Sequence, residues 1–419
     1  MRCYFLICVM AGAALGPHCV SAQDLLIRGA TVHTVSAQGT LKGSDVLMHG
    51  GMITAIGRAL QAPPGAAVVE AEGRQLTPGL FGGMANIGLE EVSEESETVD
   101  SASNMKAPEW EQQWRPELDV TLAFNPRSTL VPVARIEGIT WTMLAPESED
   151  GILGGQGAAV TLDGRYDAML RGSRALFVTM GSAGAQHAGR TRAAEFMLLE
   201  QAIREARTQG PVGQGALLHA AGKEALAGYL SGGRVVFRVD RAADIREVVS
   251  FARRNGMKPV IMGGSEAWVV SKELAQADVP VILDPLADLP GDFDHLGATL
   301  ENAARLQRAG VRIAFSSGDS HNARLMRQLA GNAVAHGLRW DAALAAITAN
   351  PAEIMGLGAT RGRIAVGQVA DLVLWSGDPL DVSTLAEQVW IAGRAVEMRS
   401  RQTDLRDRYL DKVKAHQAR

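Results

Sequence analysis

The sequence contains very little cysteine, and what it has is confined to its N-terminus. Its cysteines are Cys3, Cys8 and Cys19, so the chain that follows residue 22 has none. A chain without cysteine forms no disulfide, has no thiolate nucleophile and offers no sulfur ligand to a metal. The stability of this part of the chain must therefore come from its hydrophobic core alone.

The sequence also lacks a strong charge of either sign and, beyond the N-terminus, long apolar runs. The formal net charge of -5 provides no basic field for nucleic acid, so we expect no nucleic-acid partner. No apolar run after residue 22 is long enough to span a membrane, so we expect no membrane span in the mature chain. The 47% hydrophobic and 21% charged residues are ordinary for a globular protein, and the 419 residues predict one large domain with a satellite.

Residues 1–22 show the features of a secretory signal peptide in the expected order. A positive start at Met1-Arg2 is followed by the apolar stretch 3–15 and by a small-residue cleavage site, VSA, at 20–22. A buried N-terminal helix is the structural alternative, and a lipid anchor on Cys19 is disfavoured by the preceding GPH. We expect the mature chain to begin at Gln23 and to be periplasmic or secreted.

The two ends of the mature chain are rich in strands, and its middle alternates strands with helices. A GG pair at 50–51 separates two apolar runs, which predicts a β-hairpin. Residues 370–396 repeat this style, so we expect one small β domain built from both ends. Between them, β-branched runs alternate with helical segments, at 234–239, 259–262, 279–283 and 311–315. This repeat predicts a parallel sheet covered on both faces, as a barrel first and as an open doubly wound sheet second.

Two segments interrupt this alternation. Residues 90–100 are rich in Glu and Asp, which we interpret as a solvated acidic loop, because the ligand spacing and turn glycine of a calcium loop are missing. Residues 150–158 are rich in glycine but lack the GK[ST] ending of a phosphate-binding loop. We therefore expect a tight loop there, at the top of the barrel.

Four stretches of the sequence resemble the amidohydrolase superfamily, in particular its secreted, imidazolonepropionase-like branch. They are LTPGL at 76–80, GGQGAAV at 154–160, SGDSHNAR at 317–324, and NPAEI at 350–354 continued by GRIAVGQVADLV at 362–373. The resemblance implies an α/β fold with a (β/α)8 TIM-type barrel over residues 77–359. It also implies a small composite β-sandwich formed by residues 23–76 and 360–399, followed by a C-terminal helix or tail at 400–419.

The resemblance further implies a metal site whose ligands come from the first, fifth, sixth and eighth barrel strands, and most of these ligands are replaced. The first strand carries Met84 and Asn86 in place of a His-x-His pair, and the sixth carries Gly263 in place of a histidine. At the fifth strand, Arg238 or Asp240 stands where the family has histidine. A thioether and a neutral amide do not replace two imidazoles around a divalent ion.

Asp319, the carboxylate that remains from this set, is the candidate catalytic residue. In active relatives this aspartate passes a proton from metal-bound water to the leaving nitrogen, and it would act here as a general base if burial made it more basic. A catalytic metal needs about three protein ligands, so we expect no metal ligand set and at most a weak divalent cation near Asp319. His321 and Asn322 of the same stretch, with Gln156 and Asn86, are the predicted binding residues beside it.

Arg238, Asp240 and Glu266 form a second group of candidate binding residues. Alternate residues of a strand share a face, so Arg238 and Asp240 are expected to point inward together. They would then form an ion pair in the place of the missing metal and leave a polar cavity. Such a cavity suits an anionic or zwitterionic small molecule.

Two functions fit these residues. The first is a secreted hydrolase of C–N bonds in a small cyclic amide or peptide-like substrate, with an altered or metal-free site. The second is a non-catalytic relative that binds a small molecule or stabilises an active partner, as a homodimer or as a heterodimer with an amidohydrolase relative. The fold alone does not choose between them.

Overall fold

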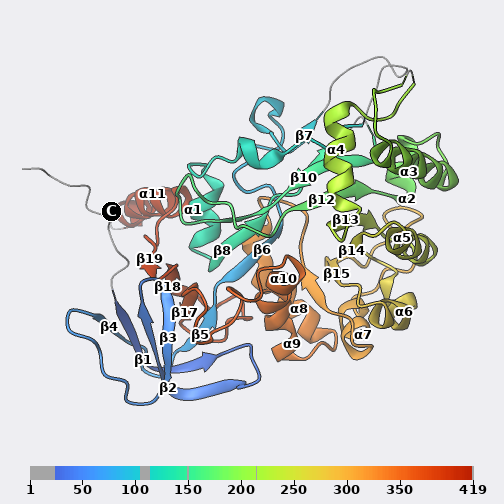
Figure 1. Ribbon diagram of the computed structural model, residues 1–419. Coiled ribbons are helices and arrows are strands. Elements are labelled where there is room, and N and C mark those ends of the chain that lie inside the picture. The colour runs from blue at the N-terminus through green and yellow to red at the C-terminus, as the bar shows by residue number, and fades with distance from the viewer. Residues whose placement is uncertain (1–23, 104–113, 149–150, 214, 418–419) are drawn as a thin grey trace, which may run out of the picture.

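The computed structural model describes residues 24–103, 114–148, 151–213 and 215–417, and the predicted signal peptide lies outside these ranges. Within them, a small sheet lies beside a larger body of strands and helices (Figure 1). No helix in the described ranges combines the length and apolar character needed to cross a bilayer.

The small sheet has eight strands and takes them from both ends of the chain. They are β1 (Leu25–His33), β2 (Thr40–His49), β3 (Met52–Gly57), β4 (Ala67–Glu70), β5 (Gln75–Pro78), β17 (Leu372–Trp375), β18 (Ala386–Ile391) and β19 (Arg394–Ala395). β5 pairs antiparallel with β17, which sets Leu76 opposite Leu374. The expected hairpin joins β2 and β3 at Gly50 and Gly51, whose φ angles of 57° and 83° suit its turn.

The larger body contains a six-stranded and a three-stranded sheet. Their strands are β6 (Leu80–Met84), β8 (Ile139–Met143), β10 (Leu153–Gly157), β11 (Ala159–Thr161), β12 (Ala175–Thr179), β13 (Arg234–Val239), β14 (Lys258–Gly263), β15 (Val281–Leu283) and β16 (Ile313–Phe315). β12 to β16 are parallel neighbours in chain order, as the alternation of strands and helices predicts. A separate two-stranded sheet pairs β7 (Ala102–Ser103) with β9 (Glu147–Ser148).

These strands follow the order of a barrel, but within the described part of the chain no ladder closes it. The consecutive strands β10 and β11 connect the two sheets, because β10 pairs with β12 and β11 pairs with β8. Next to β16, the backbone N–H of Met84 donates to the hydroxyl of Ser316 (2.9 Å) where a barrel would have a strand ladder. The α/β class is confirmed, whereas the continuous (β/α)8 ring is not formed by the described strands.

Residues 153–157 of the glycine-rich segment form β10, so the loop expected at 150–158 was wrong for them, and residue 150 lies outside the described ranges. β10 and β11 run antiparallel to their neighbours within an otherwise parallel arrangement. Glycine permits the close packing there, since a Cβ on Gly157 would lie 1.9 Å from the carbonyl oxygen of Leu144. The segment is poor in the β-branched and aromatic residues that indicate a strand, which explains the error.

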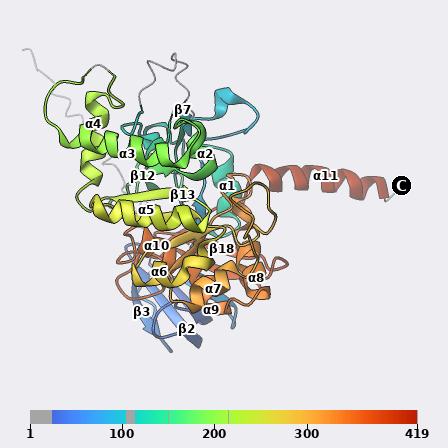
Figure 2. The same ribbon diagram turned by 90° about the vertical axis from the view of Figure 1, so that its right-hand side faces the viewer.

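Helices cover the outer face of β12 to β16, and residues alternate between the inner and outer faces of these strands (Figures 1 and 2). On β13, Val236 packs in the inner hydrophobic cluster with Val260 and Ala314, whereas Phe237 packs in the outer cluster. The helices are α1 (Leu130–Arg135), α2 (Gly181–Gln186), α3 (Arg192–Arg207), α4 (Ala220–Tyr229), α5 (Ala242–Arg254), α6 (Ser271–Gln276), α7 (Asn302–Arg308), α8 (Met326–Ala335), α9 (Trp340–Ala346), α10 (Ala349–Ile354) and α11 (Arg401–Gln417).

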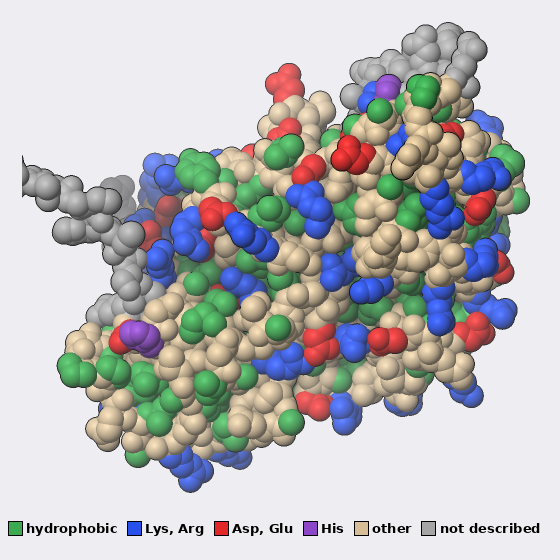
Figure 3. All heavy atoms as spheres, viewed as in Figure 1, with side chains coloured by type: hydrophobic (Ala, Val, Ile, Leu, Met, Phe, Trp, Pro, Cys, Tyr) green, Lys and Arg blue, Asp and Glu red, His purple; other side chains and the backbone are tan. Residues whose placement is uncertain are grey.

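α11 lies in the segment expected to be a helix or tail and projects from the body in Figure 2. Positive and negative side chains are interspersed over the face in Figure 3.

Candidate functional site

The carboxyl ends of β6 and of β12 to β16 lie at one end of the body, where sites on such folds form. We call the residues that follow these strands the carboxyl-end face. It comprises residues 84–90, 180–182, 240–244, 263–266, 284–297 and 316–322. Most of the predicted site residues lie on this face, in two groups.

The first group surrounds Glu90, which belongs to the segment 90–100 that we expected to be a solvated acidic loop. Glu90 is instead largely buried, with 12% of its side chain exposed. Its Oε2 accepts a hydrogen bond from Ser320 Oγ (2.8 Å), and its Oε1 lies 3.6 Å from His321 Nε2. Ser320 Oγ accepts in turn from the backbone N–H of Asn86 (3.1 Å). Glu90 therefore joins the loop after β6 to the loop after β16.

Asp319 lies in this group but is exposed, so the burial that its general-base role required is absent. Its Oδ1 accepts from the backbone N–H of His321 (2.7 Å), and its Oδ2 accepts from Asn322 Nδ2 (2.7 Å). These bonds close the turn that precedes the 3-10 helix at Ala323–Leu325. The three residues lie together as predicted, and in this arrangement the carboxylate organises the turn.

The second group contains Arg238 and Asp240, and the expected ion pair between them was wrong. Arg238 does point inward, with 18% of its side chain exposed, but its guanidinium donates to the carbonyls of Pro146 (2.9 Å) and Ala145 (3.3 Å) and lies 3.5 Å from Glu147. Burial lowers the pKa of Arg238, and Glu147 partly offsets that effect. The Arg238 side chain therefore ties β13 to the segment after β8.

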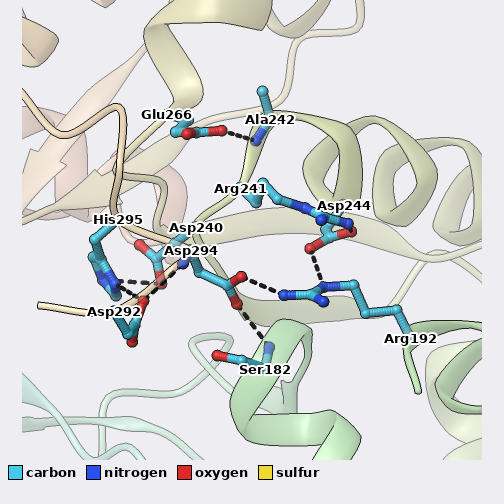
Figure 4. A network of polar contacts seen from close by, with 10 residues as sticks. All are labelled: Ser182, Arg192, Asp240, Arg241, Ala242, Asp244, Glu266, Asp292, Asp294 and His295. Carbon is cyan, nitrogen blue, oxygen red and sulfur yellow. Dashed lines mark hydrogen bonds and ion pairs between the residues drawn. The ribbon is translucent and has the colours of Figure 1, made fainter. Parts of the chain in front are cut away.

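Asp240 has other partners at the end of β13. Its Oδ1 accepts from both the backbone N–H (3.1 Å) and the hydroxyl (2.8 Å) of Ser265, and its Oδ2 lies 3.6 Å from His295 Nε2. The other ring nitrogen of His295 lies 2.6 Å from Asp292 Oδ1 (Figure 4). Burial works against the charged imidazole, but Asp292 and Asp240 raise the pKa of His295 above its ordinary value. Asp240 therefore does not pair with Arg238, because Ser265 and His295 already bind both of its carboxylate oxygens.

Next to His295, an ion-pair network of two buried aspartates and the half-buried Arg192 holds the loop after β15. Arg192 of α3 donates to Asp244 (2.9 Å) and to Asp294, and Asp294 also accepts from the backbone N–H of Ser182 (2.7 Å) (Figure 4). Burial works against the Asp294 carboxylate, but Ser182 and Arg192 together hold the pKa of Asp294 below its ordinary value. None of these residues was singled out from the sequence as a site residue, because they come from three different helices and one loop that are far apart in the sequence.

Glu195, one turn into α3, is a carboxyl group that sequence reasoning missed altogether. Only 1% of its surface is exposed, and Oε1 has no hydrogen-bond partner among the described residues. Burial, above all, raises the pKa of Glu195 to about 8, while the N–H of Gly181 acts against this rise. The side chain is therefore protonated at neutral pH.

The two remaining predicted residues have structural contacts. Glu266 accepts from the backbone N–H groups of Ala242 (2.9 Å) and Gly297 (3.2 Å), so it caps the N-terminus of α5. Gln156 lies on β10 away from the carboxyl-end face, where its Oε1 accepts from the hydroxyl of Tyr229 in α4 (2.9 Å). The structure thus does not bring Gln156 to the other site residues.

The positions that the resemblance assigns to metal ligands carry other side chains in this sequence. Met84 is buried in the inner cluster, Gly263 offers no side chain, and Arg238 brings a positive charge to the fifth strand. In the described ranges, no three His, Cys, Asp or Glu side chains lie close enough together to hold a metal ion.

Gly263 is constrained by its neighbour as well as by its backbone. Its φ is 91°, and a Cβ there would lie 2.7 Å from Asp240 Oδ1. We expect Gly263→Ala to lower the free energy of unfolding by about 2–3 kcal/mol, because the strain of a positive φ adds to this clash. Gly310→Ala is the matched control, since Gly310 has a φ of 90° and nothing within 4 Å of a Cβ. Equal losses for the two variants in denaturant titrations would contradict a role for Asp240.

Comparison with known proteins supports the resemblance seen in the sequence. The amidohydrolase family model matches residues 162–399. Amidohydrolase tasK of Hapsidospora irregularis is 47% identical over 60 residues, 14% of this chain and 6% of that protein. The imidazolonepropionase of Chromobacterium violaceum is 36% identical over 110 residues, 25% of each protein. The chain thus spans a quarter or less of the curated relatives it matches.

Solved structures extend the likeness to nearly the whole chain. An amidohydrolase of Thermotoga maritima superimposes with a TM-score of 0.78 at 25% identity, over 90% of this chain and 100% of that one. A prolidase complexed with N-methylphosphonate-L-proline superimposes with a TM-score of 0.55 at 14% identity over 90% of this chain and 100% of that one, which shows a shared fold alone. The family model covers more than half of the sequence, and the chain belongs to the amidohydrolase family.

Proposed function

We propose that this protein is an exported amidohydrolase-family member that binds a small molecule at its carboxyl-end face without the family's metal-dependent hydrolysis of C–N bonds. The observation that carries this proposal is the inward guanidinium of Arg238, which with Asp240 is one of the two candidates for the fifth-strand ligand position. A built-in cation repels a divalent ion, and the two carbonyl acceptors and Glu147 hold the guanidinium in place. Met84 and Gly263 also support the proposal, because neither residue supplies a metal ligand of the usual kind.

The groups left at the face suit a small polar molecule. Asn86 uses its Oδ1 to accept from the backbone N–H of Ala145 (3.3 Å), and no described residue accepts from its Nδ2. His321 is half-exposed and Glu90 contributes a negative charge beneath it. Asn86 and His321 thus offer hydrogen-bond donors, and Glu90 offers an acceptor, at the ends of β6 and β16. These groups match an amide-containing or zwitterionic ligand.

Metal content and turnover of the mature protein test the proposal. We expect purified protein to contain zinc or manganese far below one ion per chain, and added metal to produce no chelator-sensitive hydrolysis of cyclic amides or dipeptides. Arg238→Met removes the cation and is the matched variant for metal titration by calorimetry. One ion per chain in the unaltered protein, with turnover that a chelator abolishes, would overturn the proposal.

Hydrolysis without a metal is the second candidate, and the contact between Glu90 and His321 favours it. The pair, with Asp319 in the same turn, places carboxylate and imidazole groups on the face where an acid and a base are needed. No hydrogen bond joins Ser320 to His321 in the structure, so a serine nucleophile is not supported. Turnover that resists chelators and disappears in Asp319→Asn would establish this function in place of the first.

A further inference from the structure

A cleft of about 440 Å³ lies at the other end of the strands, near the amino ends of β13 to β16. These strands are parallel, so their amino ends lie together at one edge of the sheet and their carboxyl ends at the other. The cleft is therefore remote from the carboxyl-end face. Its basic lining residues are Arg234, Arg253, Lys258 and Arg312, and its acidic ones are Asp278 and Glu353. We call it the basic cleft.

The basic residues are placed there by the strand pattern. Arg234 and Lys258 are directly opposed in the pairing of β13 with β14. Each lies two positions before a residue of the inner cluster, Val236 on β13 and Val260 on β14, and so shares the inward face of its strand. Like charges that face each other on neighbouring strands repel, and an anion bound between them would relieve this repulsion.

The acidic residues of the cleft are already engaged. Glu353 lies 2.9 Å from Arg312 Nε and also pairs with Arg363, and Asp278 lies 3.8 Å from Arg312. Within the described part of the chain, Arg234, Arg253 and Lys258 form no ion pair. The cleft therefore carries more positive charge than its own carboxylates neutralise.

Arg234 is half-buried, whereas Arg253 and Lys258 are exposed. Its Nη1 donates to the carbonyls of Arg174 (3.2 Å) and Gly172 (3.4 Å), which are neutral acceptors. Burial, partly offset by Tyr229, lowers the pKa of Arg234. A desolvated guanidinium without a carboxylate partner is costly, and its fork of N–H donors matches an oxyanion.

We propose that the basic cleft binds a small oxyanion, a phosphate- or carboxylate-bearing molecule, through Arg234, Arg253 and Lys258. The volume is in the range of small-molecule sites, and the Arg and Lys side chains supply both forked and point-charge contacts. This binding is independent of any ligand at the carboxyl-end face, since it uses the opposite ends of the strands.

Calorimetry on the full mature chain tests the proposal with two probes, inorganic phosphate and succinate, at constant ionic strength. We expect saturable binding of at least one probe, weakened about tenfold by Arg253→Ala and by Lys258→Ala. Arg254→Ala is the matched control, because Arg254 is adjacent on α5 but binds Ser250 (2.6 Å) and does not line the cleft. Both exchanged residues are exposed, so the fold should survive, which a thermal melt checks.

The relative affinity of the probes separates a phosphate site from a carboxylate site, and either result supports the proposal. Absence of saturable binding by both probes would overturn it. So would equal weakening by Arg253→Ala and Arg254→Ala, because that result describes a diffuse surface charge. Failure here leaves the metal and hydrolysis results untouched, so the two proposals fail separately.

Discussion

Replacing Asp371 with asparagine is expected to lower the free energy of unfolding by about 3–5 kcal/mol. Asp371 pairs with Arg361, and only 5% and 11% of the two side chains are exposed. Asp371 Oδ1 accepts a hydrogen bond from the backbone N–H of Ala392 (2.8 Å), and asparagine keeps an oxygen for this bond. The exchange, however, leaves the charge of Arg361 buried without a counterion. Chemical denaturation of the full chain measures the loss.

A double variant separates the charge effect from the hydrogen bonds. Arg361→Met combined with Asp371→Asn removes the unpaired charge, so it should recover much of the stability that Asp371→Asn loses. A double variant as unstable as the sum of its single variants would show that the ion pair is not the cause.

Replacing Glu195 with glutamine is expected to stabilise the protein at alkaline pH, by up to about 4 kcal/mol at pH 9. The folded chain holds the Glu195 proton up to about pH 8, whereas the unfolded chain releases it near the ordinary value of 4.5. The folded state therefore binds more protons in this window, and this group lowers stability progressively as the pH rises from about 4.5 to about 8. Below pH 4.5 the two proteins should differ little.

Unfolding titrations at a series of pH values, on both proteins, give this difference directly. Glu247→Gln on α5 is the control, because Glu247 is an exposed helical glutamate with no ion pair among the described residues. It should leave the pH dependence unchanged. A constant difference between Glu195→Gln and the unaltered protein across all pH values would show that Glu195 titrates normally.

The sequence predicted those parts of the fold that depend on local patterns. The Gly50-Gly51 hairpin and the parallel run from β13 to β16 follow from turn chemistry and from β-branched runs. β10 was missed because Gly157 is required by the close approach of Leu144, a residue outside the segment, and not by any local pattern. Close contacts between distant segments leave no periodic signal in a single sequence.

The candidate site was predicted less completely, for a related reason. The loop around Asp319 was predicted because its residues are consecutive, but the proximity of Glu90 to His321 could not be predicted, because 230 positions separate Glu90 from the adjacent Ser320. The sequence did contain one signal, since Glu90 directly follows the apolar run Ile87-Gly88-Leu89, whereas the later acids of this segment do not. The partners of Arg238 and Asp240 depend on Glu147 and His295, which no strand pattern places.

The small sheet has a consequence for biosynthesis. The indole N–H of Trp375 donates to the hydroxyl of Thr77 (2.9 Å) across 298 positions of sequence, within the pairing of β5 with β17. While the ribosome is still making the middle of the chain, β5 lacks this neighbour and exposes an edge that other chains can join. The small sheet of a nascent chain thus stays incomplete until nearly all of the chain has emerged from the ribosome.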